Sequence, residues 1–167
     1  MKKADKNEIS CSIWRAIEKI GDSWSLLILR DLGNGVVHFD EFQKSLGIAP
    51  GVLSKRLSAL VEGGLVRKEI YQTNPPRAKY VLTEVGEDFL PVLAVFMAWG
   101  NKHSSPNGID TQLVDRETHK KISPIVVDAK TGKPIDFGKI VYAGGPANTP
   151  EKIRLLKDRG MPLAAAK

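Results

Sequence analysis

The chain has 167 residues, of which 42% are hydrophobic and 26% are charged, and its formal net charge is +6. This composition supports a globular core, and no apolar run approaches the roughly 20 residues that a membrane helix needs. The single cysteine excludes an internal disulfide framework and a multi-cysteine metal site. Because the first ten residues lack an apolar signal core, we expect a cytoplasmic protein that does not contact a membrane.

The positive charge favours a polyanionic partner such as nucleic acid. Basic and acidic residues nearly balance within residues 1–103, so the first part of the chain is not uniformly basic. A nucleic acid would therefore be contacted through individually placed side chains.

Apolar residues at helical spacing predict a first helix over residues 9–20. A second helix over 23–32, capped by Ser23, has a wide apolar face and is expected to lie mostly buried. Residues 36–38 fit a short strand, and residues 39–46 fit a third helix with acidic residues at its positive N-terminal end.

A fourth helix begins at Pro50, because proline is tolerated at the first helical position. Its inward stripe consists of Leu53, Leu57, Leu60 and Val61. At about 100° per residue, Lys55 and Ser58 point away from that stripe, and Ser54 and Arg56 lie on its two flanks. This helix thus presents small and basic side chains to its surroundings.

Two strands are expected next, over residues 65–71 and 77–83. The proline pair at 75–76 predicts a loop at their tip and not a tight turn. Thr83 can cap a long helix over residues 84–102, in which a proline at position 91 indicates a kink or a delayed start. The apolar stripe of that helix is larger than a terminal helix needs and suggests a partner surface.

Composition changes after residue 103, which we take as the end of a domain over residues 1–103. Residues 104–110 are expected to be a linker, followed by a β-rich extension over 111–167 that ends in a short helix. The expected strands of the extension are 112–115, 121–128 and 134–143, with a turn at 128–132 and a helix from Pro150 to about Asp158. We find no internal repeat.

The order of elements is that of a winged helix-turn-helix, an α+β and mainly α fold, with a C-terminal β-hairpin and short-helix extension. A helix fits the DNA major groove, and a basic wing can reach the neighbouring backbone or minor groove. The candidate DNA-binding residues are Ser54, Lys55, Arg56, Ser58, Asn74, Arg77 and Lys79. The alternative is that these side chains form an ordinary solvated surface.

Three segments, CSIWRAIEKIGDSWSLLILRDL, HFDEFQKSLGIAPGVLSKRLSALVEGGLV and YQTNPPRAKYVLTEVGEDFLPVLAVFMAWG, resemble the HxlR family of bacterial winged-helix transcriptional regulators. The resemblance spans about residues 9–102. It implies a homodimer, built from the first helix and the helix after the wing, that binds double-stranded DNA at a palindromic operator. The interface would contain Ile13, Ile17, Phe89, Leu93, Phe96 and Trp99, whose alternative role is packing within one subunit.

The resemblance further implies control of a nearby promoter, with repression as the expected outcome and a small-molecule or thiol signal as the input. The sequence departs from the family pattern at Ala49 and Gly51, where serine and lysine are common, and at Asp22 and Ser23, where Gly-Lys is common. These departures motivate an alternative function, in which the winged domain is a dimerisation scaffold of a protein-interaction adaptor.

Cys11 occupies a position that resembles the redox site of some family members. Redox chemistry there would need a lowered thiol pKa, which a helix N-terminus can supply. The alternative is a packing cysteine without reactivity. His38, His103 and His119 are far apart and lack ligand partners at metal spacing, so we expect no metal and no cofactor. No nucleophile–base pair is apparent, and we expect that the protein is not an enzyme.

Overall fold

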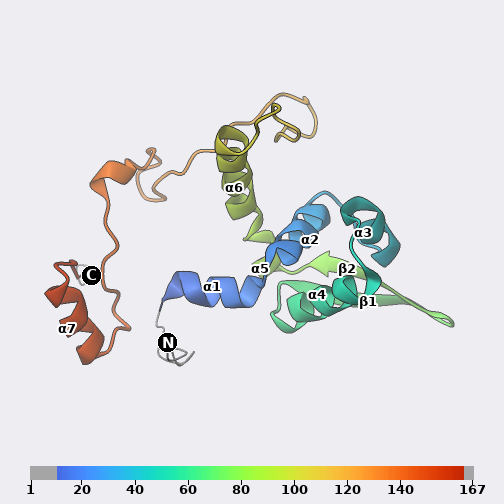
Figure 1. Ribbon diagram of the computed structural model, residues 1–167, viewed down its shortest axis with the longest axis horizontal. Coiled ribbons are helices and arrows are strands. Elements are labelled where there is room, and N and C mark those ends of the chain that lie inside the picture. The colour runs from blue at the N-terminus through green and yellow to red at the C-terminus, as the bar shows by residue number, and fades with distance from the viewer. Residues whose placement is uncertain (1–10, 164–167) are drawn as a thin grey trace. The chain divides into compact units, whose positions relative to one another are not determined.

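The structure is a computed structural model that describes residues 11–163 (Figure 1). The described residues divide into two compact units, 11–124 and 125–163. The linker expected at 104–110 lies inside the first unit, and the first two residues of the helix expected at 9–20 lie outside the described residues.

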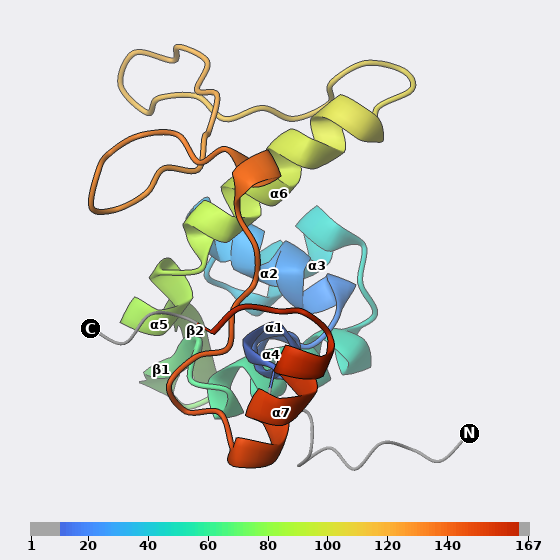
Figure 2. The same ribbon diagram turned by 90° about the vertical axis from the view of Figure 1, so that its left-hand side faces the viewer.

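The first unit has a helical body with a two-stranded antiparallel sheet (Figures 1 and 2). Its elements are α1 (Ser12–Ile20), α2 (Ser23–Gly33), α3 (Phe39–Leu46), α4 (Pro50–Glu62), β1 (Val66–Thr73), β2 (Pro76–Leu82), α5 (Glu84–Glu87) and α6 (Leu90–His103). Helix α2 lies at the centre, where it contacts α3, α4, α6 and β2. This arrangement confirms the predicted winged helix-turn-helix.

The core forms where α2, α3, α4 and the start of β1 meet. It consists of Ile28, Leu29, Leu32, Phe42, Ile48, Leu53, Leu57, Leu60, Leu65 and Val66. The three leucines from α4 are fully buried, and Val61, the fourth residue of the predicted inward stripe, is partly buried against this core. Burial of such side chains is worth about 1.5–3 kcal/mol each, so the core holds α4 with one face outward.

The start of α2 differs from the prediction. Asp22 is the N-cap, and its Oδ1 accepts a hydrogen bond from the backbone N–H of Ser25 at 3.3 Å, whereas Ser23 is the first helical residue. Aspartate is as good a cap as serine, so the sequence offered two neighbouring candidates. The acidic start predicted for α3 is confirmed, since Glu41 accepts hydrogen bonds from the backbone N–H groups of the two residues before the helix.

β1 extends two residues beyond the predicted end, β2 begins one residue earlier than predicted, and their connection is a tight turn at Asn74 and Pro75. Thr73 pairs with Pro76 across it, so the loop expected there is wrong. Proline is tolerated as the first residue of a strand, and Pro76 therefore does not interrupt the pairing.

The short strand predicted at 36–38 is reduced to a single bridge between His38 and Lys79 of β2. The carbonyl of Val37 accepts a hydrogen bond from the backbone N–H of Tyr80 at 2.8 Å. β2 is thus bonded on both sides, and β1 is the outer strand of the wing.

Two helices occupy the range of the single helix expected over 84–102, because the helical conformation is interrupted between α5 and α6. Pro91 lies in the first turn of α6, which confirms the delayed start. Thr83 caps α5 as predicted: its hydroxyl accepts from the backbone N–H of Gly86 at 3.2 Å and donates to the carbonyl of Gly64 at 2.7 Å.

The prediction of a β-rich C-terminal extension is not confirmed for residues 104–163. Residues 104–163 contain isolated bridges, a short 3-10 helix η1 (Phe137–Lys139) and the helix α7 (Pro150–Asp158), but no regular strand. Most apolar side chains of the expected strands are exposed, and strands without a covered face are not stable alone. The predicted start of α7 is confirmed, since Thr149 accepts a hydrogen bond from the backbone N–H of Lys152.

Two turns of the extension repeat each other. They belong to residues 113–122 (LVDRETHKKI) and 126–135 (VVDAKTGKPI). In each, an aspartate Oδ1, of Asp115 or Asp128, accepts hydrogen bonds from the backbone N–H groups two and three residues later. The residue after each threonine is left-handed, with φ of 54° and 66°. The prediction that the chain has no internal repeat is therefore wrong.

Candidate nucleic-acid interface

The outer face of α4 carries the side chains that the sequence predicted there. Ser54, Lys55 and Ser58 are exposed, while the leucines on the opposite face are fully buried. Ala49 supplies no side-chain cap, and Pro50 occupies the first turn. Small residues beside one lysine leave the helix backbone accessible along this face.

Arg56 is turned toward its own protein. Its Nη2 forms an ion pair with Oδ2 of Asp22, and its side chain is 29% exposed. The Nε atom of Arg56 is buried and has no hydrogen-bond partner among residues 11–163. The arrangement ties the middle of α4 to the N-terminus of α2, and it separates Arg56 from the exposed Lys55.

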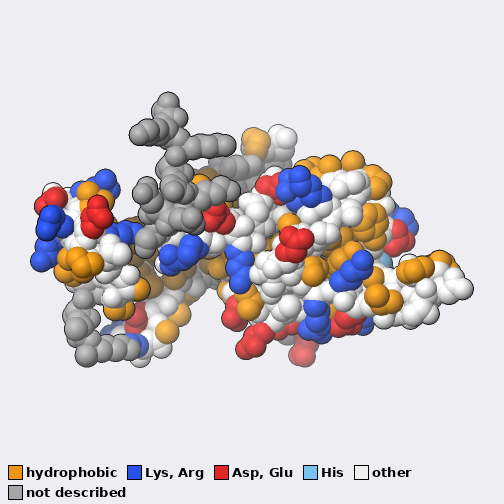
Figure 3. All heavy atoms as spheres, turned by 90° about the horizontal axis from the view of Figure 1, so that it is seen from below, with side chains coloured by type: hydrophobic (Ala, Val, Ile, Leu, Met, Phe, Trp, Pro, Cys, Tyr) orange, Lys and Arg blue, Asp and Glu red, His pale blue; other side chains and the backbone are white. Residues whose placement is uncertain are grey.

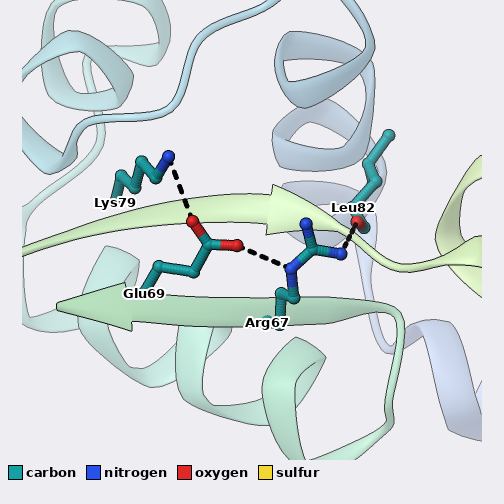
Figure 4. A network of polar contacts seen from close by, with 4 residues as sticks. All are labelled: Arg67, Glu69, Lys79 and Leu82. Carbon is teal, nitrogen blue, oxygen red and sulfur yellow. Dashed lines mark hydrogen bonds and ion pairs between the residues drawn. The ribbon is translucent and has the colours of Figure 1, made fainter. Parts of the chain in front are cut away.

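The wing presents Asn74 and Arg77 at its exposed tip. Lys79, in contrast, is part of a network along the strands: its Nζ lies 3.0 Å from Oε2 of Glu69, whose Oε1 lies 2.7 Å from Nε of Arg67 (Figure 4). The Arg67 guanidinium also donates to the carbonyl of Leu82 at 3.4 Å. A hydrogen bond from Arg67, and to a smaller extent one from Lys79, holds the pKa of the Glu69 carboxyl below its ordinary value.

Sequence reasoning missed the two acidic partners of this surface, Asp22 and Glu69. Glu69 faces Lys79 only because of the strand register, which the sequence did not establish. Charges of both signs and apolar side chains are mixed over the right-hand part of the space-filling view, where no continuous basic surface is seen (Figure 3). This matches the balanced charge of residues 1–103.

The comparisons with known proteins agree with this geometry. The model of the HxlR-like helix-turn-helix family matches residues 19–107. The chain belongs to this family. It is therefore a DNA-binding transcriptional regulator of the helix-turn-helix type, and its relatives and structural neighbours are regulators and not enzymes.

The HxlR-like chain is 35% identical to the HTH-type transcriptional regulator Rv3095 of Mycobacterium tuberculosis, over 81% of this chain and 86% of that protein. It is also similar to two solved structures described as transcription factors. For PA1607 the TM-score is 0.73 at 33% identity, covering 82% of this chain and 96% of the other. For PA1374 of Pseudomonas aeruginosa the TM-score is 0.64 at 41% identity, covering 87% and 100%.

The apolar residues predicted for a dimer interface of this HxlR-like protein fall into two groups. Phe89 and Leu93 are half-buried against the core. The other four are exposed to between 52% and 60%: Ile13, Ile17, Phe96 and Trp99. Phe96 and Trp99 stack with ring centroids 6.5 Å apart on α6. Neither α1 nor α6 has a buried residue.

The thiol of Cys11 is exposed at the N-terminus of α1, and its redox role stays a prediction. Residues 11–163 hold no group of three His, Cys, Asp or Glu side chains that could bind a metal ion. Within that range no helix has the length and apolar character needed to cross a membrane.

Proposed function

We propose that this HxlR-like protein is a homodimeric repressor that binds a palindromic operator. Each subunit would place α4 in the major groove of one half-site and its wing beside the adjacent backbone. The observation that carries this proposal is the outer face of α4, where Ser54, Lys55 and Ser58 are exposed next to a wing with Arg77 at its tip.

In this proposal, the exposed side chains contact DNA and the ion-paired side chains position the elements that carry them. Lys55 and Arg77 neutralise phosphates or reach base edges, and Ser54, Ser58 and Asn74 make short polar contacts. Arg56 and Lys79 act differently, because their charged groups are held by Asp22 and Glu69. They position α4 and stiffen the wing, which lowers the entropic cost of ordering these elements on DNA.

The proposed dimer is supported by the exposed apolar faces of α1 and α6. An apolar helix such as α6, with Phe96 and Trp99 largely exposed, is uncommon on a monomer and indicates an interaction surface. Two subunits would set the spacing of two copies of α4 to about one helical turn of DNA. A dimer that covers an operator excludes RNA polymerase from an overlapping promoter, and repression follows.

The test is binding of the purified protein to labelled DNA from its own upstream region and to random DNA, by fluorescence anisotropy at several salt concentrations. We expect specific binding that persists at about 150 mM salt, where nonspecific binding is weak. The double variant Lys55→Ala with Arg77→Ala should weaken binding at least about tenfold and lower the salt slope by up to about four, because the dimer loses two cations from each subunit.

The matched control is Lys130→Ala with Lys157→Ala, which removes two exposed lysines from the other unit. It should leave the operator affinity unchanged. Equal and salt-sensitive binding to both DNAs, with the dimer intact, would contradict the proposal and favour the protein-interaction adaptor.

A further inference from the structure

A pocket of about 470 Å³ lies between α2 and α6, beside the chain segment that follows α6. Its apolar wall consists of Leu26, Leu27, Leu90, Leu93, Phe96 and Met97. Thr111 and Leu113 close one side, and the Asn101 amide donates to the Thr111 carbonyl at 2.8 Å, which fixes that segment against α6. Pockets that bind small molecules have this size and this apolar lining.

The charged residues that line the pocket are of one sign. Arg30 is the one charged residue in the lining, and no acidic side chain is among the described residues that line it. Its Nε and Nη2 donate to Oδ1 of the buried Asp31, at 2.9 and 2.7 Å. These bonds fix the guanidinium plane and leave Nη1 without a partner among the described residues, so Arg30 retains donors for an anion.

We propose that this pocket binds a small amphipathic carboxylic acid, with its apolar body between α2 and α6 and its carboxylate at Arg30. The apolar wall selects a hydrocarbon or aromatic body, and the single cation selects a monoanion over a cation. A polyanion would not fit, because one guanidinium already shared with Asp31 cannot compensate several desolvated charges.

The position of the pocket gives the ligand a route to DNA binding. Helix α2 contacts both α6 and α4, and α6 is part of the proposed dimer interface. A ligand that separates α2 from α6 changes the angle between the DNA-binding body and the dimer, and hence the spacing of the two copies of α4. This regulatory effect rests on the proposed function, whereas occupation of the pocket does not.

The test uses decanoate, decanol and decylammonium, each below its micelle concentration, in calorimetric titrations of the full chain without DNA. We expect decanoate to bind at least about tenfold more tightly than decylammonium, because only the anion gains a charge-assisted hydrogen bond. Arg30→Gln should weaken decanoate about tenfold and change decanol less than twofold, and Arg30→Lys should restore part of the difference.

Ala94 lines the pocket, and Ala94→Trp should abolish binding of decanoate and decanol by filling it. Ala59→Trp places the same side chain on an exposed site of α4 and should change neither, and Lys130→Gln is the charge control for Arg30→Gln. Melting curves of each variant verify that it is folded.

Failure of all three probes to bind would overturn the proposal. The same failure is expected if the partner subunit fills the pocket. Decanoate binding that is insensitive to Arg30→Gln, or to Ala94→Trp, would also overturn it. None of these readouts involves DNA, so their failure is distinct from a failure of the proposed operator binding.

Discussion

Arg56 of α4 forms an ion pair with Asp22, the residue that caps α2. One carboxylate thus satisfies the N-terminus of a central helix with Oδ1 and holds the proposed DNA-reading helix with Oδ2. The contact joins two elements that the core already packs together, and it holds the Arg56 guanidinium at the N-terminus of α2.

We expect Asp22→Ala to lower the free energy of unfolding by about 1–2 kcal/mol, because it removes a helix cap and an ion pair together. Arg56→Ala should cost less, since half-exposed pairs contribute about 0.2–1 kcal/mol. Urea denaturation of both single variants and the double variant measures the coupling between them. A coupling of zero would contradict the role of Arg56 as a positioning residue.

Gly86 of α5 lies so close to the backbone of Leu65 that a residue with a side chain does not fit there. A Cβ atom at this position would overlap the backbone carbonyl oxygen of Leu65. Gly86→Ala should therefore destabilise the protein by at least about 1–3 kcal/mol, as in other overpacked sites. Gly100→Ala is the matched control, because it lies in α6 with open space around it. It should be neutral or stabilising by up to about 1 kcal/mol in the same denaturation experiment.

The Glu69 network makes the stability of the wing depend on pH. Because Arg67 and Lys79 hold the folded-state pKa of Glu69 below its ordinary value of 4.5, its contribution is present above that value and is lost as the pH falls through the lowered pKa. Glu69→Gln should melt at a lower temperature than the wild type at pH 7.

At acidic pH, once Glu69 is protonated in the wild type, the two melting temperatures should converge. The difference at pH 7 should also shrink in 1 M salt, since exposed ion pairs are screened. A difference that persists unchanged at low pH and high salt would show that the network is not electrostatic.

A charged substitution at Phe96 tests the proposed dimer. Its side chain is 60% exposed and stacks on Trp99, and a buried aromatic anchor of an interface is worth at least about 2 kcal/mol. Phe96→Asp should therefore shift sedimentation at micromolar concentration from dimer to monomer without lowering the melting temperature of the monomer. Val141→Asp adds the same charge at another exposed apolar residue and should not change the association.

Local patterns in the sequence were enough to predict the helical body and the family. The spacing of Leu53, Leu57 and Leu60 predicted the buried side of α4, and Pro50 predicted where α4 begins. Pro91 indicated either a kink or a delayed start, and α6 shows the delayed start. Helical periodicity and capping act over a few residues, so they can be found without knowledge of the fold. The repeated Asp-x-x-Thr turns are equally local, and they could have been found in the same way.

Relations between distant residues needed the tertiary structure. The sequence by itself determined which side chains α4 exposes, but only the packing of α4 on α2 decided that Arg56 meets Asp22 while Lys55 remains exposed. Strand register likewise decided that Lys79 meets Glu69. In the extension, the strands predicted over 112–115, 121–128 and 134–143 did not form, because strand stability depends on a covering surface that the local sequence does not specify.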